Sequence, residues 1–423
     1  MYYPARLGLA SLANDPPEAR GARRWLARLR SMRAELDRRA LALLSSGHLA
    51  TDLASGSLPA LLPFLVEKYG LSYTLAGTLI LGSAVSSSLI QPLFGLWSDR
   101  RGALWLLPTG VAVAGIGIAL AAVAPVYAAT ALLVVVSGVG IAAYHPEGSK
   151  FTAYASGRRR ASGMSLFSVG GNIGYALGPI LTTPLVLWLG LRGELLIALP
   201  CVAIALVLAA SMRFLSTFVP NGQVRRETAG VDRPGALALL LGVVAFRSVA
   251  WFGLITFVPL WEVSLGHSKA YGNHLLSLML IVGGIGTLIA GPAADRFGRR
   301  PVLTGSTAVT CPLMLVFVLV GGVPGAICLA LVGVAVISTF GVTMVMSQEY
   351  LPRHIGMASG LSIGLSIGLG GIAAVMLGAL ADSVDLRTAL LVAAAAPIVA
   401  LVLCFLLPPT RTKARFEPEV AVP

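Results

Sequence analysis

The sequence repeats a short pattern: residues 95–102 read Gly-Leu-Trp-Ser-Asp-Arg-Arg-Gly, and residues 291–300 read Gly-Pro-Ala-Ala-Asp-Arg-Phe-Gly-Arg-Arg, an offset of 196. Each copy follows one long apolar run and precedes another. A second pair, Ser-Gly-Met-Ser at 162–165 and Ser-Gly-Leu-Ser at 359–362, has an offset of 197. Two independent markers at nearly one offset predict a chain built from two related halves.

The composition excludes a soluble globular protein. Of the 423 residues, 56% are hydrophobic and 12% are charged, whereas about a quarter of a soluble domain is charged. The 48 glycines and 25 prolines lie within long apolar runs, which favours packed helices over a β-barrel with alternating strands. Twelve runs are each long enough to span hydrocarbon as a helix of about 20 residues. They fall near residues 40–66, 72–97, 102–123, 126–149, 161–189, 193–215, 236–264, 270–294, 301–321, 324–348, 355–381 and 386–407.

The predicted fold is an all-α polytopic membrane protein, with twelve transmembrane helices in two pseudo-symmetric six-helix bundles. The axis relating the bundles is expected to lie along the membrane normal. The expected units are an N-terminal tail at 1–39, an N-terminal bundle at 40–215, a linker at 216–235, a C-terminal bundle at 236–408 and a C-terminal tail at 409–423.

The net charge of +13 follows from the topology. Nearly all of the 31 Lys and Arg residues fall on one predicted face, while the other face holds only Lys68, Arg192, Lys269 and Arg387. Because cytoplasmic loops carry the excess of Lys and Arg, both tails and the linker are expected in the cytoplasm. A nucleic-acid partner thereby loses its main support. The segment 20–39 has the spacing of a basic amphipathic helix on anionic lipid, but a solvated tail is the open alternative.

The repeated pattern resembles the signature of the major facilitator superfamily. The resemblance implies a transporter whose cytoplasmic turns act as a latch. An aspartate at a helix end can hold an arginine and helix-terminal amides, while glycine lets two helices approach. The alternative is a plain turn with topological arginines. The latch residues expected from the two copies are Gly95, Asp99, Arg100, Gly291, Asp295 and Arg296.

A closer resemblance covers the first half, between Gly47 and Pro179. Residues 47–52 read Gly-His-Leu-Ala-Thr-Asp, residues 144–149 read Tyr-His-Pro-Glu-Gly-Ser, and residues 165–172 read Ser-Leu-Phe-Ser-Val-Gly-Gly-Asn. These segments resemble the fosmidomycin-resistance branch, which implies a proton-driven drug exporter of a bacterial inner membrane. The second half carries only the general superfamily pattern.

One part of the first half is similar to the antiporter motif of superfamily exporters. Gly174, Gly178 and Pro179 match it and are expected to pack closely against a neighbouring helix. The trailing glycine pair of that motif is replaced by threonines at 182 and 183. The arginine that many drug antiporters carry in the fourth span is also missing. The motif therefore favours export only modestly, and proton coupling has to use other residues.

His48 and Asp52 are the first candidates for proton coupling. They lie four residues apart, so on a helix they share one face. Ionisable side chains in hydrocarbon are costly unless they are paired or functional. A carboxylate surrounded by hydrocarbon tends to take up a proton, so Asp52 is the expected carrier and His48 its relay. The open alternative is a hydrogen-bonded pair that only fixes helix packing.

Six residues are candidates for the substrate cavity. His145 and Glu147 flank Pro146, which is expected to end or kink the fourth span and so turn both side chains toward the cavity; Lys150 favours a surface position for Glu147 instead. Arg247 lies deep in the seventh span and needs an anionic partner, either a substrate or Asp52, unless it only snorkels. The full set of candidates is Gln91, His145, Glu147, Asn172, Arg247 and Trp251.

The predicted function is that of a secondary transporter that exchanges protons for small drugs or anionic and amphipathic compounds. The sequence has no Walker A loop and no constellation of nucleophile and base, so neither an ATP-driven pump nor an enzyme is expected. The four cysteines have no metal-cluster spacing, and no cofactor or bound metal is expected. A monomer in the bilayer is the expected state.

Three alternatives stay open at this stage. The first is an uptake symporter or uniporter. The second is a divalent-metal transporter, if His48, Asp52, His145 and Glu147 converge. The third is a receptor or assembly factor on a transporter scaffold.

Overall fold

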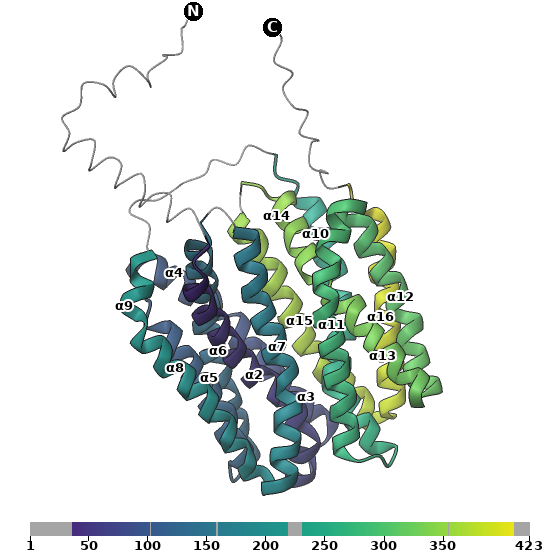
Figure 1. Ribbon diagram of the computed structural model, residues 1–423. Coiled ribbons are helices and arrows are strands. Elements are labelled where there is room, and N and C mark those ends of the chain that lie inside the picture. Colours follow the sequence, from purple (N-terminus) through teal and green to yellow (C-terminus); the bar gives the residue numbers. More distant parts are fainter. Residues whose placement is uncertain (1–35, 102, 158–159, 219–230, 354, 410–423) are drawn as a thin grey trace, which may run out of the picture.

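The computed structural model describes residues 36–101, 103–157, 160–218, 231–353 and 355–409. Throughout these residues the regular structure is helical. Figure 1 shows two groups of helices side by side, one from the first half of the chain and one from the second. Helix α2 begins and helix α16 ends at the same end of the molecule, here called the terminal face. The other end is called the opposite face.

The helices of the first half are α2 (Arg38–Tyr69), α3 (Tyr73–Ser88), α4 (Gln91–Arg101), α5 (Leu106–Val123), α6 (Tyr127–Ala155), α7 (Arg160–Leu189), the 3-10 turn η1 (Gly190–Ile197), α8 (Ala198–Ala210), α9 (Met212–Leu215) and η2 (Ser216–Phe218). The second half has α10 (Pro234–Ser264), α11 (Lys269–Phe297), α12 (Arg299–Val320), α13 (Gly322–Ile337), α14 (Phe340–Tyr350), α15 (Ile355–Ser383) and α16 (Leu386–Leu406).

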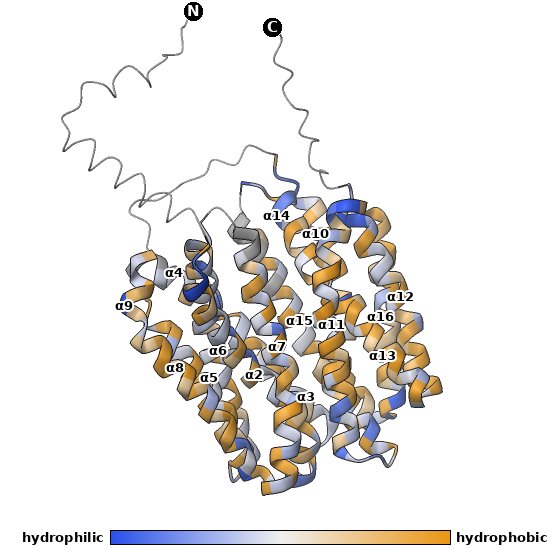
Figure 2. Ribbon diagram, in the orientation of Figure 1, coloured by the Kyte–Doolittle hydropathy of each residue, from blue (hydrophilic) through white to orange (hydrophobic). Residues whose placement is uncertain are grey.

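The all-α membrane fold predicted from the sequence is confirmed. The described residues hold 11 segments that are long and apolar enough to cross a membrane, and one of them, Gly163–Ala210, covers the fifth and sixth predicted spans. Three predicted spans are broken: the second between α3 and α4, the sixth between α8 and α9, and the tenth between α13 and α14. Figure 2 shows apolar residues along the helices, with hydrophilic ones gathered toward both ends. The tail 1–35, most of the linker and residues 410–423 lie outside the described residues.

Helix starts at equivalent places in the two halves use the same chemistry. Ser72 precedes α3, and its hydroxyl accepts a hydrogen bond from the Leu75 amide. Ser268, 196 residues later, precedes α11 and accepts from the Tyr271 amide. A serine oxygen at this position satisfies one of the amides that the first helical turn leaves unpaired. The repeat inferred from the loop patterns therefore extends to the helix caps.

Helices α2 and α7 pack in unusually close contact, and this contact positions the candidate site. A Cβ atom at Gly174 would overlap the Leu49 carbonyl oxygen, and one at Gly178 would overlap the backbone of Gly56. Small residues allow two membrane helices to bring their backbones together. Pro179 lies within α7 and does not end it.

The two halves contact each other through polar groups near the opposite face. The Asp382 carboxylate on α15 accepts hydrogen bonds from the Tyr73 amide at 2.7 Å and the Thr74 amide at 2.8 Å, both on α3. Lys269 forms an ion pair with Glu67 across the same boundary. Asn273 on α11 donates to the Ala60 carbonyl at 3.0 Å. These contacts hold the two bundles together at the opposite face.

We expect Gly174→Ala to destabilise the fold, because the added methyl group would meet backbone rather than a movable side chain. Overpacking of this kind costs roughly 1–3 kcal/mol. The measurement is the Tm of the purified protein in detergent. Gly305→Ala is the matched control, because a Cβ at this exposed helical glycine meets nothing within 4 Å. Equal Tm values for the two variants would contradict the close α2–α7 contact.

We expect Asp382→Asn to weaken the contact between the bundles at the opposite face, because a neutral amide accepts hydrogen bonds less strongly than a carboxylate. The distance between spin labels at the exposed residues Leu75 and Val384 should broaden toward longer values. The control is Asp385→Asn, because Asp385 caps α16 within its own bundle by accepting from the Thr388 amide. If the distance distribution changes equally in the control, Asp382 has no special role at this boundary.

Candidate functional site

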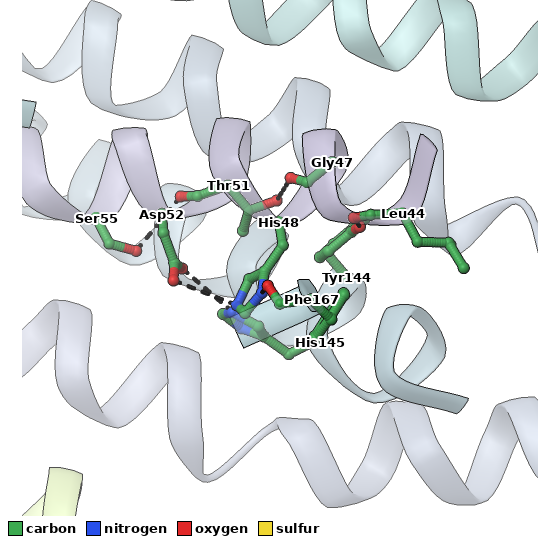
Figure 3. A network of polar contacts seen from close by, with 9 residues as sticks. All are labelled: Leu44, Gly47, His48, Thr51, Asp52, Ser55, Tyr144, His145 and Phe167. Atoms are coloured by element: carbon green, nitrogen blue, oxygen red, sulfur yellow. Dashed lines mark hydrogen bonds and ion pairs between the residues drawn. The ribbon is translucent and has the colours of Figure 1, made fainter. Parts of the chain in front are cut away.

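Three titratable side chains of the first half converge between α2 and α6; together they are called the triad. The His48 Nε2 atom lies 3.3 Å from Oδ2 of Asp52, and the His145 Nε2 atom lies 3.2 Å from Oδ1. Each histidine therefore faces a different oxygen of one carboxylate, as Figure 3 shows. The exposed fractions of the side chains are 12% for His48, 18% for Asp52 and 23% for His145. The triad is therefore largely buried, but part of each side chain is still accessible to solvent.

The two helices supply these residues by simple geometry. His48 and Asp52 lie one turn apart on α2, and residues four apart stack on one face of a helix. Tyr144, next to His145 on α6, is fully buried and donates its hydroxyl to the Leu44 carbonyl. This bond ties α6 to α2 directly beside the triad.

Helix α7 fixes the orientation of the His48 ring. The Nδ1 atom of His48 lies 2.7 Å from the Phe167 carbonyl oxygen. The imidazole of His48 also stacks on the phenyl ring of Phe167, with centroids 4.0 Å apart. Gly171, one turn further on, leaves room for the pair. A Cβ there would lie 2.5 Å from Cε1 of His48 and 2.6 Å from Oδ2 of Asp52. Sequence reasoning missed both contributions, although the Gly-Gly pair before Asn172 was a visible signal.

The two imidazoles and the carboxylate of the triad could bind a metal ion, but their hydrogen bonds fit the binding of a proton better. One atom from each side chain of the triad can be chosen so that all three lie within 4.8 Å of one another, and divalent ions accept imidazole and carboxylate. The Nδ1 atom of His145 is buried without a hydrogen-bond partner among the described residues. A metal on Nε2 would force a proton onto that Nδ1, and a buried donor is rarely left unpaired.

Glu147 does not join the triad, contrary to the expectation for the cavity. Its side chain is 1% exposed, lies 2.8 Å from the Lys150 ammonium and accepts from the Ser98 hydroxyl on α4. Helix α6 continues through Pro146 without ending, from Tyr127 to Ala155. Residues two apart on an intact helix point to different sides. His145 and Glu147 are therefore separated by the helix itself.

Arg247 does not face the triad, and the expected pair with Asp52 is not formed. Its guanidinium is 6% exposed and bonds only neutral groups of the second half. The contacts are with the hydroxyls of Ser306, Thr307 and Thr339 and the carbonyls of Ala335 and Val336. Two of these five neutral acceptors bond Nη1 and three bond Nη2. The pair with Asp52 was therefore wrong, whereas a substrate anion as the partner of Arg247 stays a prediction.

The other cavity candidates occupy the boundary between the halves or its edge. Asn172 on α7 donates to the Thr287 hydroxyl on α11 at 3.4 Å. Trp251 on α10 packs against the ring of Tyr175, whose centroid is 6.4 Å away on α7. Gln91 is half-buried at the start of α4. Asn172 and Trp251 thus contact the other half, and Gln91 lies toward the terminal face.

The expected latch residues are only partly described. The side chains of Asp99 and Arg100 lie outside the described set. Gly95 lies near Pro146 of α6. In the second copy, Gly291, Asp295 and Arg296 are all exposed. Two carboxylates lie close to these loops: Glu349, which sequence reasoning did not consider, and Glu147, for which Lys150 had favoured a position outside the cavity. Glu147 pairs with Lys150 beneath α4, and Glu349 pairs with Arg299 between α14 and α12.

Comparisons with known proteins agree with this architecture. The family model described as Major Facilitator Superfamily matches residues 44–283 and 240–422. The MFS-type transporter YfnC of Bacillus subtilis (strain 168) is 32% identical over 375 residues, 85% of this chain and 90% of that protein. The fosmidomycin resistance protein of Escherichia coli (strain K12) is 30% identical over 376 residues, 86% of this chain and 92% of that protein.

A solved structure shows the same fold. The bacterial homologue of the human lysosomal transporter Spinster, in an inward-facing and occupied conformation, superposes with a TM-score of 0.74 at 15% identity. The match covers 89% of this chain and 98% of that one. From the matched family and these relatives we conclude that the chain is a multi-pass membrane transporter, not an enzyme, and that it belongs to the Major Facilitator Superfamily.

Proposed function

We propose that this protein is a proton-coupled antiporter that exports small amphipathic compounds, drugs among them, by alternating access. The observation that carries the proposal is the triad, in which Asp52 lies between two histidines in a membrane-spanning bundle. Ionisable groups inside a membrane are costly and in transporters mark proton relays. Imidazole and carboxylate are both groups that accept and donate protons in such relays.

The placement of the triad supports coupling to movement of the bundles. The polar contacts of Asp382 and Lys269 hold the halves together at the opposite face, whereas the bond from Asn172 to Thr287 lies further toward the terminal face. The triad lies about midway along α2. In superfamily transporters two halves rock around a site near the bilayer midplane. By the positive-inside rule both tails are cytoplasmic. The conformation seen here is therefore proposed to admit protons and substrate from the cytoplasmic side of a bacterial inner membrane.

The export direction is supported by one relative, the fosmidomycin resistance protein of Escherichia coli. Anionic substrates, which the sequence allowed beside amphipathic ones, have less support because Nη1 and Nη2 of Arg247 bond neutral groups of its own bundle. Amphipathic compounds remain the proposed cargo. The transporter is proposed to work as a monomer, since each half packs against the other within one chain.

We expect Asp52→Asn to abolish compound-driven proton flux, because an amide cannot carry the coupling charge. The assay uses everted vesicles with an acidic interior and a pH-sensitive dye, challenged with fosmidomycin and a panel of drugs. Flux should fall to the level of vesicles without the protein, while Tm stays within a few degrees of the wild type.

The matched control is Glu262→Gln, which removes a buried carboxylate whose Oε2 lies 2.7 Å from Nδ1 of His267. This is also a pair of a carboxylate and a histidine, but it lies outside the triad, so the variant should retain flux. Undiminished flux in Asp52→Asn would refute the proposed coupling. Substrate movement without any proton flux in the wild type would favour uniport.

A further inference from the structure

The hydrogen bond to Phe167 fixes which nitrogen of His48 carries a proton. A carbonyl oxygen only accepts, so the Nδ1 atom of His48, 2.7 Å away, has to donate. In a neutral imidazole the other nitrogen then has no proton. The Nε2 atom that faces Asp52 is therefore a bare acceptor unless the ring is charged. The bond to the Phe167 carbonyl thus determines which atoms can carry a proton where His48 faces Asp52.

This assignment makes the contact between His48 and Asp52 dependent on one proton. The two atoms are 3.3 Å apart, and an ionised carboxylate is also only an acceptor. One proton between them gives either an imidazolium–carboxylate pair or a protonated Asp52 that donates to Nε2. Without that proton, two acceptors face each other at hydrogen-bond distance. The deprotonated site therefore needs a donor from elsewhere.

His145 does not supply that donor, because it is already committed to the other oxygen. Its buried Nδ1 has no partner among the described residues, which fits a neutral ring with its proton on Nε2. That proton bonds Oδ1 of Asp52 at 3.2 Å. His145 can therefore hold Asp52 in place in both protonation states, and only Oδ2 and the His48 nitrogen change partners.

Among the described residues, no Lys or Arg forms an ion pair with Asp52. Tyr144 on α6 donates to a carbonyl of α2, and Tyr175 lies on α7. Helix α8 brings Cys201, whose thiol donates to the Ala50 carbonyl at 3.4 Å, and α5 carries no ionisable residue. Arg247 on α10 is bonded within its own bundle. The protonated triad is neutral overall, so loss of the proton leaves one uncompensated negative charge.

We propose that the exported compound carries a protonated amine, which binds between His48 Nε2 and Asp52 Oδ2 in place of the proton. This inference rests on the proposed antiport and names its substrate class. An ammonium group has N–H donors for both acceptors and supplies the missing charge. The rings of Tyr175 and Trp251 at the bundle boundary are aromatic groups of the kind that attract cations.

Direct competition for the same two atoms has two consequences. Binding of one ammonium releases one proton, so affinity for the amine falls about tenfold for each unit by which the pH drops below the titration of the triad. The exchange of one proton for one monovalent cation also moves no net charge. Transport of an amine should therefore be insensitive to membrane potential.

The test measures equilibrium binding to the purified full-length protein with three matched probes. Benzylammonium has the charge and the N–H donors, benzyltrimethylammonium has the charge alone, and benzyl alcohol has a neutral donor. Calorimetry in buffers of different ionisation enthalpy counts the protons released. We expect benzylammonium to bind with release of one proton and with the tenfold pH dependence, and the other two probes to bind at least tenfold more weakly.

Two variants locate the effect. Asp52→Asn should lose benzylammonium binding. His48→Gln should retain the fold, as judged by Tm, and lose the proton release. His274→Ala, on α11 and outside the triad, is the control and should behave as the wild type.

Each other outcome overturns the inference. Equal binding of benzyl alcohol without proton release would remove the amine requirement, and equal binding of benzyltrimethylammonium would remove the need for N–H donors. Proton release by Zn²⁺ but not by benzylammonium would assign the site to a metal ion. The vesicle assay separates the two proposals. Proton flux driven only by uncharged or anionic drugs refutes the amine and keeps antiport, whereas competitive amine binding without any flux refutes antiport.

Discussion

The hydrogen bond between the His48 ring and the Phe167 carbonyl is the constraint on which the rest of the site depends. It joins α2 to α7 and holds the ring stacked on the Phe167 side chain. It also leaves a single ring nitrogen free to face Asp52. A backbone carbonyl cannot change its role as an acceptor, so the direction of this bond is the same in every protonation state. The proton exchange proposed for the triad is thereby confined to Nε2 of His48 and Oδ2 of Asp52.

That bond is possible only because the two helices approach so closely. Glycines at 170, 174 and 178 on α7 and at 56 on α2 remove the side chains that would keep the backbones apart. Gly171 then leaves the space that the imidazole and the carboxylate occupy. In a membrane, where lipid tails are as apolar as leucine, close backbone packing is a main source of helix association. The residues that stabilise the bundle and the residues that shape the site are therefore neighbours on one helix face.

Much of the fold could be predicted from the sequence, because apolar run length and repeated loops reflect the membrane and the duplication directly. The pairing of His48 with Asp52 also followed from local helix geometry. The choice of His145 over Glu147 did not, because it depends on which side of α6 faces α2, and Pro146 suggested a kink that the helix does not have. The partners of Arg247 lie 59 to 92 residues away. No local pattern indicates that neutral oxygens from α12 and α13, with Thr339 just beyond, surround a buried guanidinium.

The first amides of α3 donate to the Asp382 carboxylate, so a residue of one bundle caps a helix of the other. The opening amides of a helix have no partner within it, and at Tyr73 and Thr74 that partner comes from α15. When the bundles part at this face, these two amides pass to water. The first turn of α3 is then free to fray, and its amide hydrogens should exchange at a rate that follows the opening of the transporter. The proposed alternating access would thus link the order of this helical turn to the transport state.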